Sequence, residues 1–292
     1  MADRRNLGAH NEIAPPRRGL LLPVCTPSAV SIGDLTIIAL HDGDGVETAR
    51  DILSRPGVAD GWACYADHLD SDGALTLPLG GFLIRTGAQT VLVDAGVGDF
   101  DDGKYRGGDL LTALRRHGVA PADVTDVVFT HLHFDHIGWA SHRGEVVFPN
   151  ATYRVHQADW DHFVTHGRDE HTLATLTPTT PRLAPFHGDV PIAPGVDAIF
   201  TPGHTPGTTI FVVSSRGERA LLLGDVVHSV VQFTERDWEV IWDTDPAAAR
   251  AARNRIADEI ADTADLVVAA HLPGMRFGRI VTTGGPRRFV AS

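Results

Sequence analysis

Cysteine and lysine are almost missing from this chain of 292 residues, and it has no long hydrophobic run. The two cysteines, Cys25 and Cys64, are too few for a disulfide framework, so we expect two buried small side chains and a reducing cytoplasmic location. Lys104 is the only lysine and the formal net charge is −12, so we expect no nucleic acid partner. No apolar run approaches the roughly 20 residues of a membrane span, so we expect no membrane partner.

The composition predicts one domain preceded by a short arm. Residues 1–30 contain four arginines and Pro15-Pro16, and we interpret them as an extended N-terminal arm. Residues 31–292 show neither an internal repeat nor a linker rich in proline, glycine and serine. A hydrophobic content of 43% is ample for one core in a chain of this length. We therefore predict a single domain over residues 31–292.

Three histidines and a carboxylate are packed into residues 131–136, which read HLHFDH. Imidazole and carboxylate groups are ligands that suit zinc and related ions. The spacing is too tight for one tetrahedral ion, so His131 and His133 are expected to face one ion while Asp135 and His136 face a second. Two neighbouring ions are typical of a hydrolytic site. The alternative is a loop that is rich in histidine by chance, since the chain has 16 histidines.

Further candidate ligands follow three other predicted strands. His204 comes after the apolar residues 198–200, Asp225 after 221–223, and His271 after 266–270. The HLHFDH motif itself follows the apolar residues of 126–130. Sites of open α/β sheets lie at the carboxyl ends of strands, so the four strand ends are expected to bring these side chains together.

The pattern HxHxDH at 131–136, GHTPG at 203–207, LLGD at 222–225 and the closing His271 resembles the binuclear hydrolase branch of the metallo-β-lactamase superfamily. These motifs span about half of the chain, and a looser similarity begins at Gly80. The resemblance implies two divalent metal ions, with zinc as the default. It places the first ion on His131, His133 and His204, the second on Asp135, His136 and His271, and Asp225 between them as a bridge.

Local patterns predict mixed α/β structure. Residues 81–86 and 90–94 form a hairpin, and helices begin after an Asp109 cap, at Gln157 and after an Asp245 cap. The resemblance adds a four-layer αβ/βα sandwich, with Asp94 orienting the ligand loop through hydrogen bonds rather than binding metal.

The resemblance is strongest to quorum-quenching lactonases and to the related organophosphate hydrolases. Our hypothesis is that a metal-bridging hydroxide attacks the carbonyl carbon of a lactone or related ester, with an N-acyl homoserine lactone as one candidate. Asp135 would pass a proton to the leaving group. Those lactonases have a tyrosine three residues after the bridging aspartate, where this chain has His228. An imidazole can also donate a hydrogen bond to the substrate carbonyl, and the alternative is a structural histidine.

Several alternatives stay open at this stage. An organophosphate or aryl ester hydrolase needs the same metals, whereas a thioester hydrolase lacks its basic tail here beyond Arg287 and Arg288. A β-lactamase is less favoured, because the second-metal ligand set differs from the usual antibiotic-resistance arrangement. A non-enzymatic metal protein is disfavoured, because structural zinc sites are closed by four ligands.

Four aromatic residues and one long loop bear on the pocket and the assembly. The aromatic residues are expected to line an apolar pocket or to pack, with at least two only packing: Trp139, Phe233, Trp238 and Trp242. The predicted loop at 57–77 would shape the entrance or pair subunits, and a homodimer is the prediction.

Overall fold

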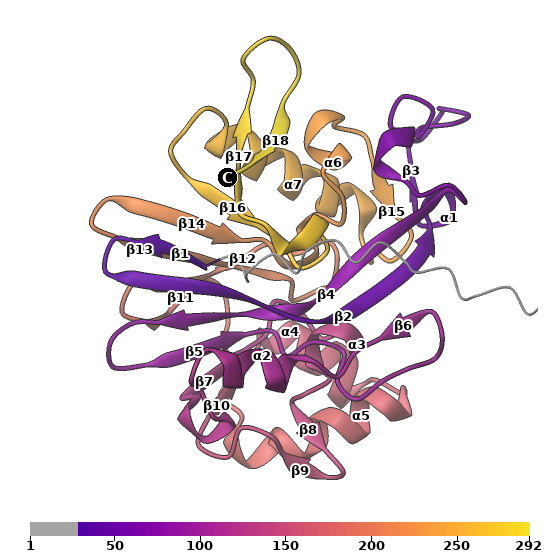
Figure 1. Cartoon of the computed structure of the whole chain (residues 1–292). Coiled ribbons are helices and arrows are strands. Elements are labelled where there is room, and N and C mark those ends of the chain that lie inside the picture. Colours follow the sequence, from indigo (N-terminus) through magenta and orange to yellow (C-terminus); the bar gives the residue numbers. More distant parts are fainter. Residues whose placement is uncertain (1–28) are drawn as a thin grey trace, which may run out of the picture.

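The computed structural model describes residues 29–292, which contain two seven-stranded sheets (Figure 1). The first sheet has the order β1 (Ala29–Ile32), β2 (Leu35–Thr48), β4 (Ala74–Arg85), β5 (Thr90–Val93), β7 (Asp126–Val128) and β10 (Thr152–Arg154), with β6 (Tyr105–Arg106) paired to β2. The second has the order β11 (Val190–Ala193), β12 (Val196–Phe200), β13 (Thr209–Ser215), β14 (Glu218–Leu222), β16 (Leu266–Val268), β17 (Gly278–Val281) and β18 (Arg288–Ala291). Two short ribbons pair β3 (Leu53–Ser54) with β15 (Glu239–Val240) and β8 (Ser141–His142) with β9 (Glu145–Val146).

The helices lie mainly outside the two sheets (Figure 1). The α-helices are α1 (Ala49–Ile52), α2 (Leu110–Arg116), α3 (Phe134–Ile137), α4 (Gln157–Trp160), α5 (Glu170–Leu176), α6 (Val231–Thr234) and α7 (Pro246–Ile260). Short 3-10 turns are η1 (Ala66–His68), η2 (Pro121–Asp123), η4 (Thr177–Arg182), η5 (Gly224–Val226) and η6 (Pro273–Met275), and η3 (Asp161–Thr165) is a π-helical turn.

Apolar side chains divide the molecule into layers. Phe82 of the first sheet meets Phe277 beside the second, with ring centroids 6.3 Å apart, inside a core that both sheets share. Because side chains alternate along a strand, Leu83 points to the opposite face and packs with Leu114 of α2. On the far side of the second sheet, Ile256 of α7 packs against the strands in the same way. These layers form the predicted αβ/βα sandwich of four layers.

The predicted hairpin and helices are present. Strands β4 and β5 pair antiparallel from Phe82↔Val93 to Arg85↔Thr90. Helix α7 begins at Pro246, and the Asp245 side chain accepts a hydrogen bond from the Ala248 N–H at 3.0 Å, as its cap position predicts. The helix predicted from Gln157 is α4, which continues into the π-helical turn η3.

Three local expectations were wrong. Helix α2 begins where predicted, but the Asp109 side chain does not cap it, and the Leu110 N–H donates instead to Asp42 Oδ1 at 2.7 Å. The loop predicted to extend to residue 77 ends earlier, because β4 begins at Ala74. Cys64 is exposed rather than buried.

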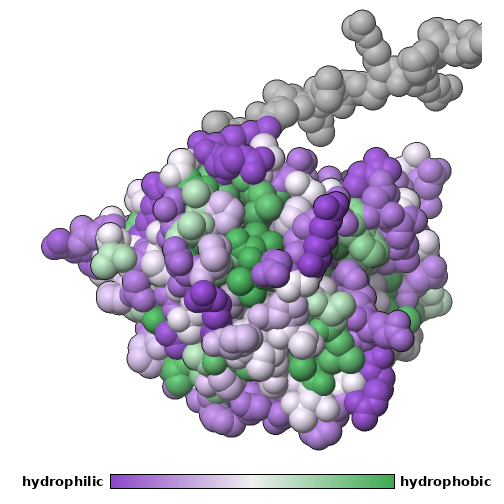
Figure 2. Space-filling view, turned by 90° about the horizontal axis from the view of Figure 1, so that it is seen from below, coloured by the Kyte–Doolittle hydropathy of each residue, from purple (hydrophilic) through white to green (hydrophobic). Residues whose placement is uncertain are grey.

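The predicted N-terminal arm lies outside the described residues, apart from two residues of β1, and so does Cys25. Among residues 29–292, no helix has the length and apolar character that crossing a membrane requires. Hydrophilic side chains cover most of the face seen in Figure 2, with hydrophobic side chains in separate patches. Four large hydrophobic side chains of the described residues are exposed: Val46, Val58, Ile241 and Val290.

Candidate metal centre

The seven predicted ligands come together in two groups. Within each group the ligand atoms lie within 4.8 Å of one another. The first group is His131, His133, His204 and Asp225, and the second is Asp135, His136 and His271. All seven side chains are buried except that of His133, which is half-buried.

Strand direction explains this convergence. Strands β14 and β16 are parallel, and β12 runs the same way because β13 pairs antiparallel with both β12 and β14. Their carboxyl ends deliver His204, Asp225 and His271. In the first sheet, the chain continues from the end of β7 to His133, whose backbone is extended. The short helix α3 begins at the next residue and carries Asp135. The arrangement predicted at the strand ends is therefore confirmed.

Asp225 lies between the two groups and turns one oxygen to each. Its Oδ2 is 3.6 Å from His131 Nε2 and 3.4 Å from His204 Nε2. Its Oδ1 is 3.1 Å from His136 Nε2 and 3.2 Å from His271 Nε2. This is the geometry that a bridging carboxylate requires.

The outward ring nitrogens of four histidines each have a partner. His204 Nδ1 lies 2.9 Å from Asp243 Oδ1, and His271 Nδ1 lies 3.0 Å from the carbonyl oxygen of Pro78. Both partners accept, so they hold a proton on Nδ1 and leave Nε2 as the nitrogen that faces inward, as a metal ligand needs. His136 and His131 are held in the same way by the Asp94 group described next.

Asp94 orients two of the ligands, as predicted. Its carboxylate accepts a hydrogen bond from the Thr130 N–H and another from the Thr130 hydroxyl, each at 2.8 Å. It also lies 2.9 Å from His136 Nδ1. Because the Thr130 hydroxyl donates to Asp94, its oxygen is left to accept from His131 Nδ1, 3.0 Å away. The sequence did not indicate the unusual backbone of Asp94, whose φ is 59°.

Asp159 is a supporting residue that the sequence analysis missed. This buried carboxylate accepts hydrogen bonds from the Leu132 N–H at 3.2 Å, the Thr205 hydroxyl at 2.9 Å and the Gly207 N–H at 2.6 Å. It joins the HLHFDH loop to the GHTPG turn. Burial raises the pKa of Asp159 to about 6, although these hydrogen bonds alone would lower it.

Asp42 is a second buried carboxylate without a sequence signal. It accepts hydrogen bonds from the N–H groups of Val97, Gly98 and Leu110, and from the indole N–H of Trp139 at 3.0 Å. It thereby fixes the loop after β5, the start of α2 and the residues just beyond α3.

Burial and Asp225 set the charges of the ligands. Burial lowers the pKa of His131 and of His133 well below the usual histidine range, so both rings are neutral and keep a lone pair. Burial acts the same way on His204, but hydrogen bonds to Asp225 and Asp243 outweigh it and raise its pKa to about 9. Although burial alone would raise it, the surrounding imidazoles hold the pKa of Asp225 well below its usual range.

Two buried atoms of the seven predicted ligands lack hydrogen-bond partners among the described residues. They are His136 Nε2 and Asp225 Oδ1, which lie 3.1 Å apart but are not aligned for a hydrogen bond. Burying such groups unpaired is costly, and a cation bound by both would satisfy them. Individual contacts such as His131 Nε2 to His133 Nδ1 at 3.0 Å and His136 Nε2 to Asp135 Oδ2 at 3.7 Å lie on either side of the edge of about 3.3 Å expected for a tetrahedron of zinc ligands at about 2.0 Å. The residues therefore fit two divalent metal ions.

His228 lies inside the cluster. Its side chain is fully buried, its Nε2 is 3.1 Å from Asp225 Oδ2, and its ring stacks on His271 with centroids 5.4 Å apart. Burial lowers its pKa, so the ring is neutral. Neither ring nitrogen has an aligned hydrogen-bond partner among the described residues.

The four singled-out aromatic residues divide as expected. Trp139, Phe233 and Trp238 are buried in packing clusters, and the Trp238 ring lies 5.0 Å from that of Trp62 in the loop before β4. Trp242 is half-buried and lines the cavity at the cluster.

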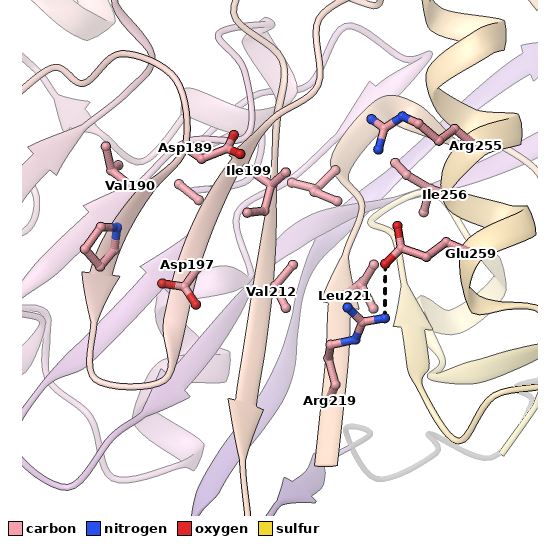
Figure 3. A pocket seen from close by; sticks show the side chains of 13 residues that line it. Asp189, Val190, Asp197, Ile199, Val212, Arg219, Leu221, Arg255, Ile256 and Glu259 are labelled. Carbon is pink, nitrogen blue, oxygen red and sulfur yellow. Dashed lines mark hydrogen bonds and ion pairs between the residues drawn. The ribbon is translucent and has the colours of Figure 1, made fainter. Parts of the chain in front are cut away.

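The cavity beside the cluster has a volume of about 280 Å³. Four predicted ligands line it, and the other lining side chains are Glu47, Leu77, Tyr105, Phe134 and Trp242. A separate hollow of about 360 Å³ lies on the outer face of the second sheet beside α7, where Arg219 pairs with Glu259 at 3.2 Å (Figure 3). No predicted ligand lines that hollow, so the candidate site is the smaller cavity.

Comparisons with known proteins identify the family of this chain. The chain belongs to the metallo-beta-lactamase superfamily, whose family pattern matches residues 81–271. It is 25% identical over 232 residues to an N-acyl homoserine lactonase of Bacillus thuringiensis, covering 71% of this chain and 89% of that protein.

Two solved structures have similar folds at 25% identity, and each comparison covers 91% of this chain and 97% of the other. One is AidC, a dizinc quorum-quenching lactonase in complex with a product, with a TM-score of 0.80. The other is the hydrolase AbOPH of the beta lactamase superfamily, with a TM-score of 0.79.

Proposed function

We propose that this protein is a metal-dependent hydrolase that opens lactones, with N-acyl homoserine lactones as the leading substrate class. The observation that carries the proposal is the pair of ligand groups that have Asp225 between them and open into one cavity. The similarity to an N-acyl homoserine lactonase and to a dizinc lactonase supports the substrate class.

We assign the first ion to His131, His133 and His204 and the second to Asp135, His136 and His271, with Asp225 bridging. Zinc is the proposed metal, because histidine and carboxylate groups with tetrahedral spacing suit it. When bound, the two ions would polarise the carbonyl and lower the pKa of water to near 7.

Asp135 is the proposed proton carrier. It lines the cavity, and its Oδ2 lies 3.5 Å from His271 Nε2, so its carboxylate borders both the ligand cluster and the substrate space. From there it would accept a proton from the attacking water and deliver it to the leaving alcohol oxygen.

A hydrogen bond from His228 to the substrate carbonyl oxygen stays a proposal, because this fully buried ring is not among the side chains that line the cavity. Its place beside Asp225 also supports a second role, in which its ring holds this carboxylate in position. A His228→Gln variant keeps a donor and is expected to retain more activity than His228→Ala. A homodimer and a cytoplasmic location remain proposals, the latter supported by the low cysteine content.

The first experiment is proton release on adding N-hexanoyl homoserine lactone to zinc-loaded protein, with Asp225→Ala as the blank. Metal content is measured in both proteins. Release that is lost in the variant supports the proposal. An absence of release from wild-type protein that holds two ions would contradict it, and phosphotriesters and aryl esters would be tested next.

A further inference from the structure

Glu47 and Tyr105 form a polar pair in the wall of the cavity. Both line it beside Asp135 and Asp225, and both are buried, with exposed fractions of 5% and 9%. The Tyr105 hydroxyl donates a hydrogen bond to Glu47 Oε1 at 2.5 Å. The lining residues that are neither ligands nor part of this pair are apolar or aromatic: Leu77, Phe134 and Trp242. Apart from the indole N–H of Trp242, this pair is therefore the polar contact that the lining residues offer a substrate away from the ligands.

The ring of Tyr105 is held in place from two sides. Tyr105 of β6 is paired with Gly45 of β2, and a Cβ at position 45 would lie 2.6 Å from the ring. On another side the ring contacts Phe134 nearly at a right angle, with centroids 5.1 Å apart. Phe134 sits between the ligands His133 and Asp135, so the tyrosine is packed directly against the ligand loop.

The pair presents an acceptor to the cavity and no net charge. Lys104 Nζ lies 2.6 Å from Glu47 Oε2 and neutralises the carboxylate. Burial, together with Glu47, raises the pKa of Tyr105, so the phenol keeps its proton at neutral pH. That single proton is donated to Glu47, which leaves only lone pairs on the phenolic oxygen. A neutral N–H donor is the complementary group.

We propose that Tyr105, held by Glu47, is a specificity-determining residue that accepts a hydrogen bond from an amide N–H of the substrate. This inference rests on the proposed function, because the amide N–H that joins the acyl chain to the lactone ring is the group recognised. A buried acceptor rejects ligands that lack the matching donor, since it would be left unpaired. The site would thus prefer N-acyl homoserine lactones to lactones and esters without an amide.

The first test compares kcat/KM for N-hexanoyl homoserine lactone with kcat/KM for γ-decalactone, which has the ring and an alkyl chain but no amide. The ratio of the two values is measured in wild type, Tyr105→Phe and Tyr65→Phe. Tyr65 is a matched control, because its hydroxyl donates to Glu235 at 2.8 Å and it does not line the cavity. The ratio is expected to fall about ten-fold in Tyr105→Phe and to keep its value in Tyr65→Phe. A ratio unchanged in Tyr105→Phe overturns the inference.

The second test needs no activity. Wild type and Tyr105→Phe are titrated with the ring-opened acid N-hexanoyl homoserine. They are also titrated with the analogue in which a methyl group replaces the hydrogen on the amide nitrogen, so that the amide has no N–H. Wild type is expected to bind the parent acid about ten-fold more tightly, and Tyr105→Phe to lose this preference. Equal affinities in wild type, or no binding of either acid, overturn the inference. If wild type opens neither lactone, the proposed function fails while this comparison still decides N–H recognition.

Discussion

Asp243 accepts a hydrogen bond from His204 Nδ1 at 2.9 Å, although 39 residues separate them in the chain. The exposed fractions of the two side chains are 2% and 1%, so water does not compete for the contact. The hydrogen bond at Nδ1 turns Nε2 toward His133 and Asp225. We therefore expect affinity for the first metal ion to depend on a residue that we do not assign as a ligand.

Asp243→Ala is expected to weaken zinc binding at the first site by about 10- to 100-fold, because His204 loses the partner that fixes its tautomer. Competition with a chromophoric chelator measures this. Asp245→Ala is the control, since it removes only the cap of α7 and is expected to cost about 1 kcal/mol of stability. An affinity within two-fold of wild type in Asp243→Ala would contradict the prediction.

Asp42→Ala is expected to lower the free energy of unfolding by about 3 to 5 kcal/mol, because several buried N–H groups lose their acceptor together. Urea denaturation followed by tryptophan fluorescence measures it. Asp44→Ala, at an exposed position two residues away, should change stability by less than about 0.5 kcal/mol. Similar losses in both variants would show that Asp42 is not the centre of this network.

Asp159 should make the stability of the metal-free protein depend on pH. Its pKa is raised from 3.8 to about 6, so folding favours the protonated carboxyl. This contribution is fully present below about pH 3.8 and is lost as pH rises through about 6, with a limit of about 3 kcal/mol. The free energy of unfolding is measured for wild type and Asp159→Asn from pH 4 to pH 8. As pH rises, the value for wild type is expected to fall relative to the value for Asp159→Asn. Parallel curves would refute this.

Gly45→Ala tests whether the position of the Tyr105 ring matters, because it leaves the hydroxyl group of Tyr105 in place. The added Cβ would lie 2.6 Å from the ring, so the ring must move. We expect the preference for the amide lactone over γ-decalactone to fall several-fold, in the direction of Tyr105→Phe. Thr48→Ala, at an exposed position on the same strand, is the control. A preference equal to wild type in Gly45→Ala would mean that the ring position does not matter.

The convergence of the proposed ligands was predictable because each follows an apolar strand and has a residue type suited to metal, as His204 and His271 illustrate. The supporting carboxylates have no such signal. Asp159 contacts Thr205 across 46 residues, and Asp42 contacts Trp139 across 97. In a chain with 37 acidic residues, only the folded structure distinguishes these from carboxylates on the surface.

The wrong local expectations have the same origin. Asp109 has the residue type and position of a helix cap, but Asp42 reaches the Leu110 N–H from a distant strand. Cys64 lies in a loop whose buried positions are taken by larger side chains such as Trp62, whose indole N–H donates to the Leu53 carbonyl. Sequence patterns predict which helices and strands form. Competition between side chains in the folded structure decides which residue makes each contact.

The carboxylate of Asp225, which we propose as a bridge, would make the two metal positions thermodynamically linked. An ion held by the first group would fix the orientation of Asp225 and change the charge that the second group offers. Thermodynamic linkage requires the effect to be reciprocal. The factor by which the first ion changes the affinity of the second therefore equals the factor by which the second changes the affinity of the first. Loading the centre is then a single coupled equilibrium rather than the filling of two independent sites.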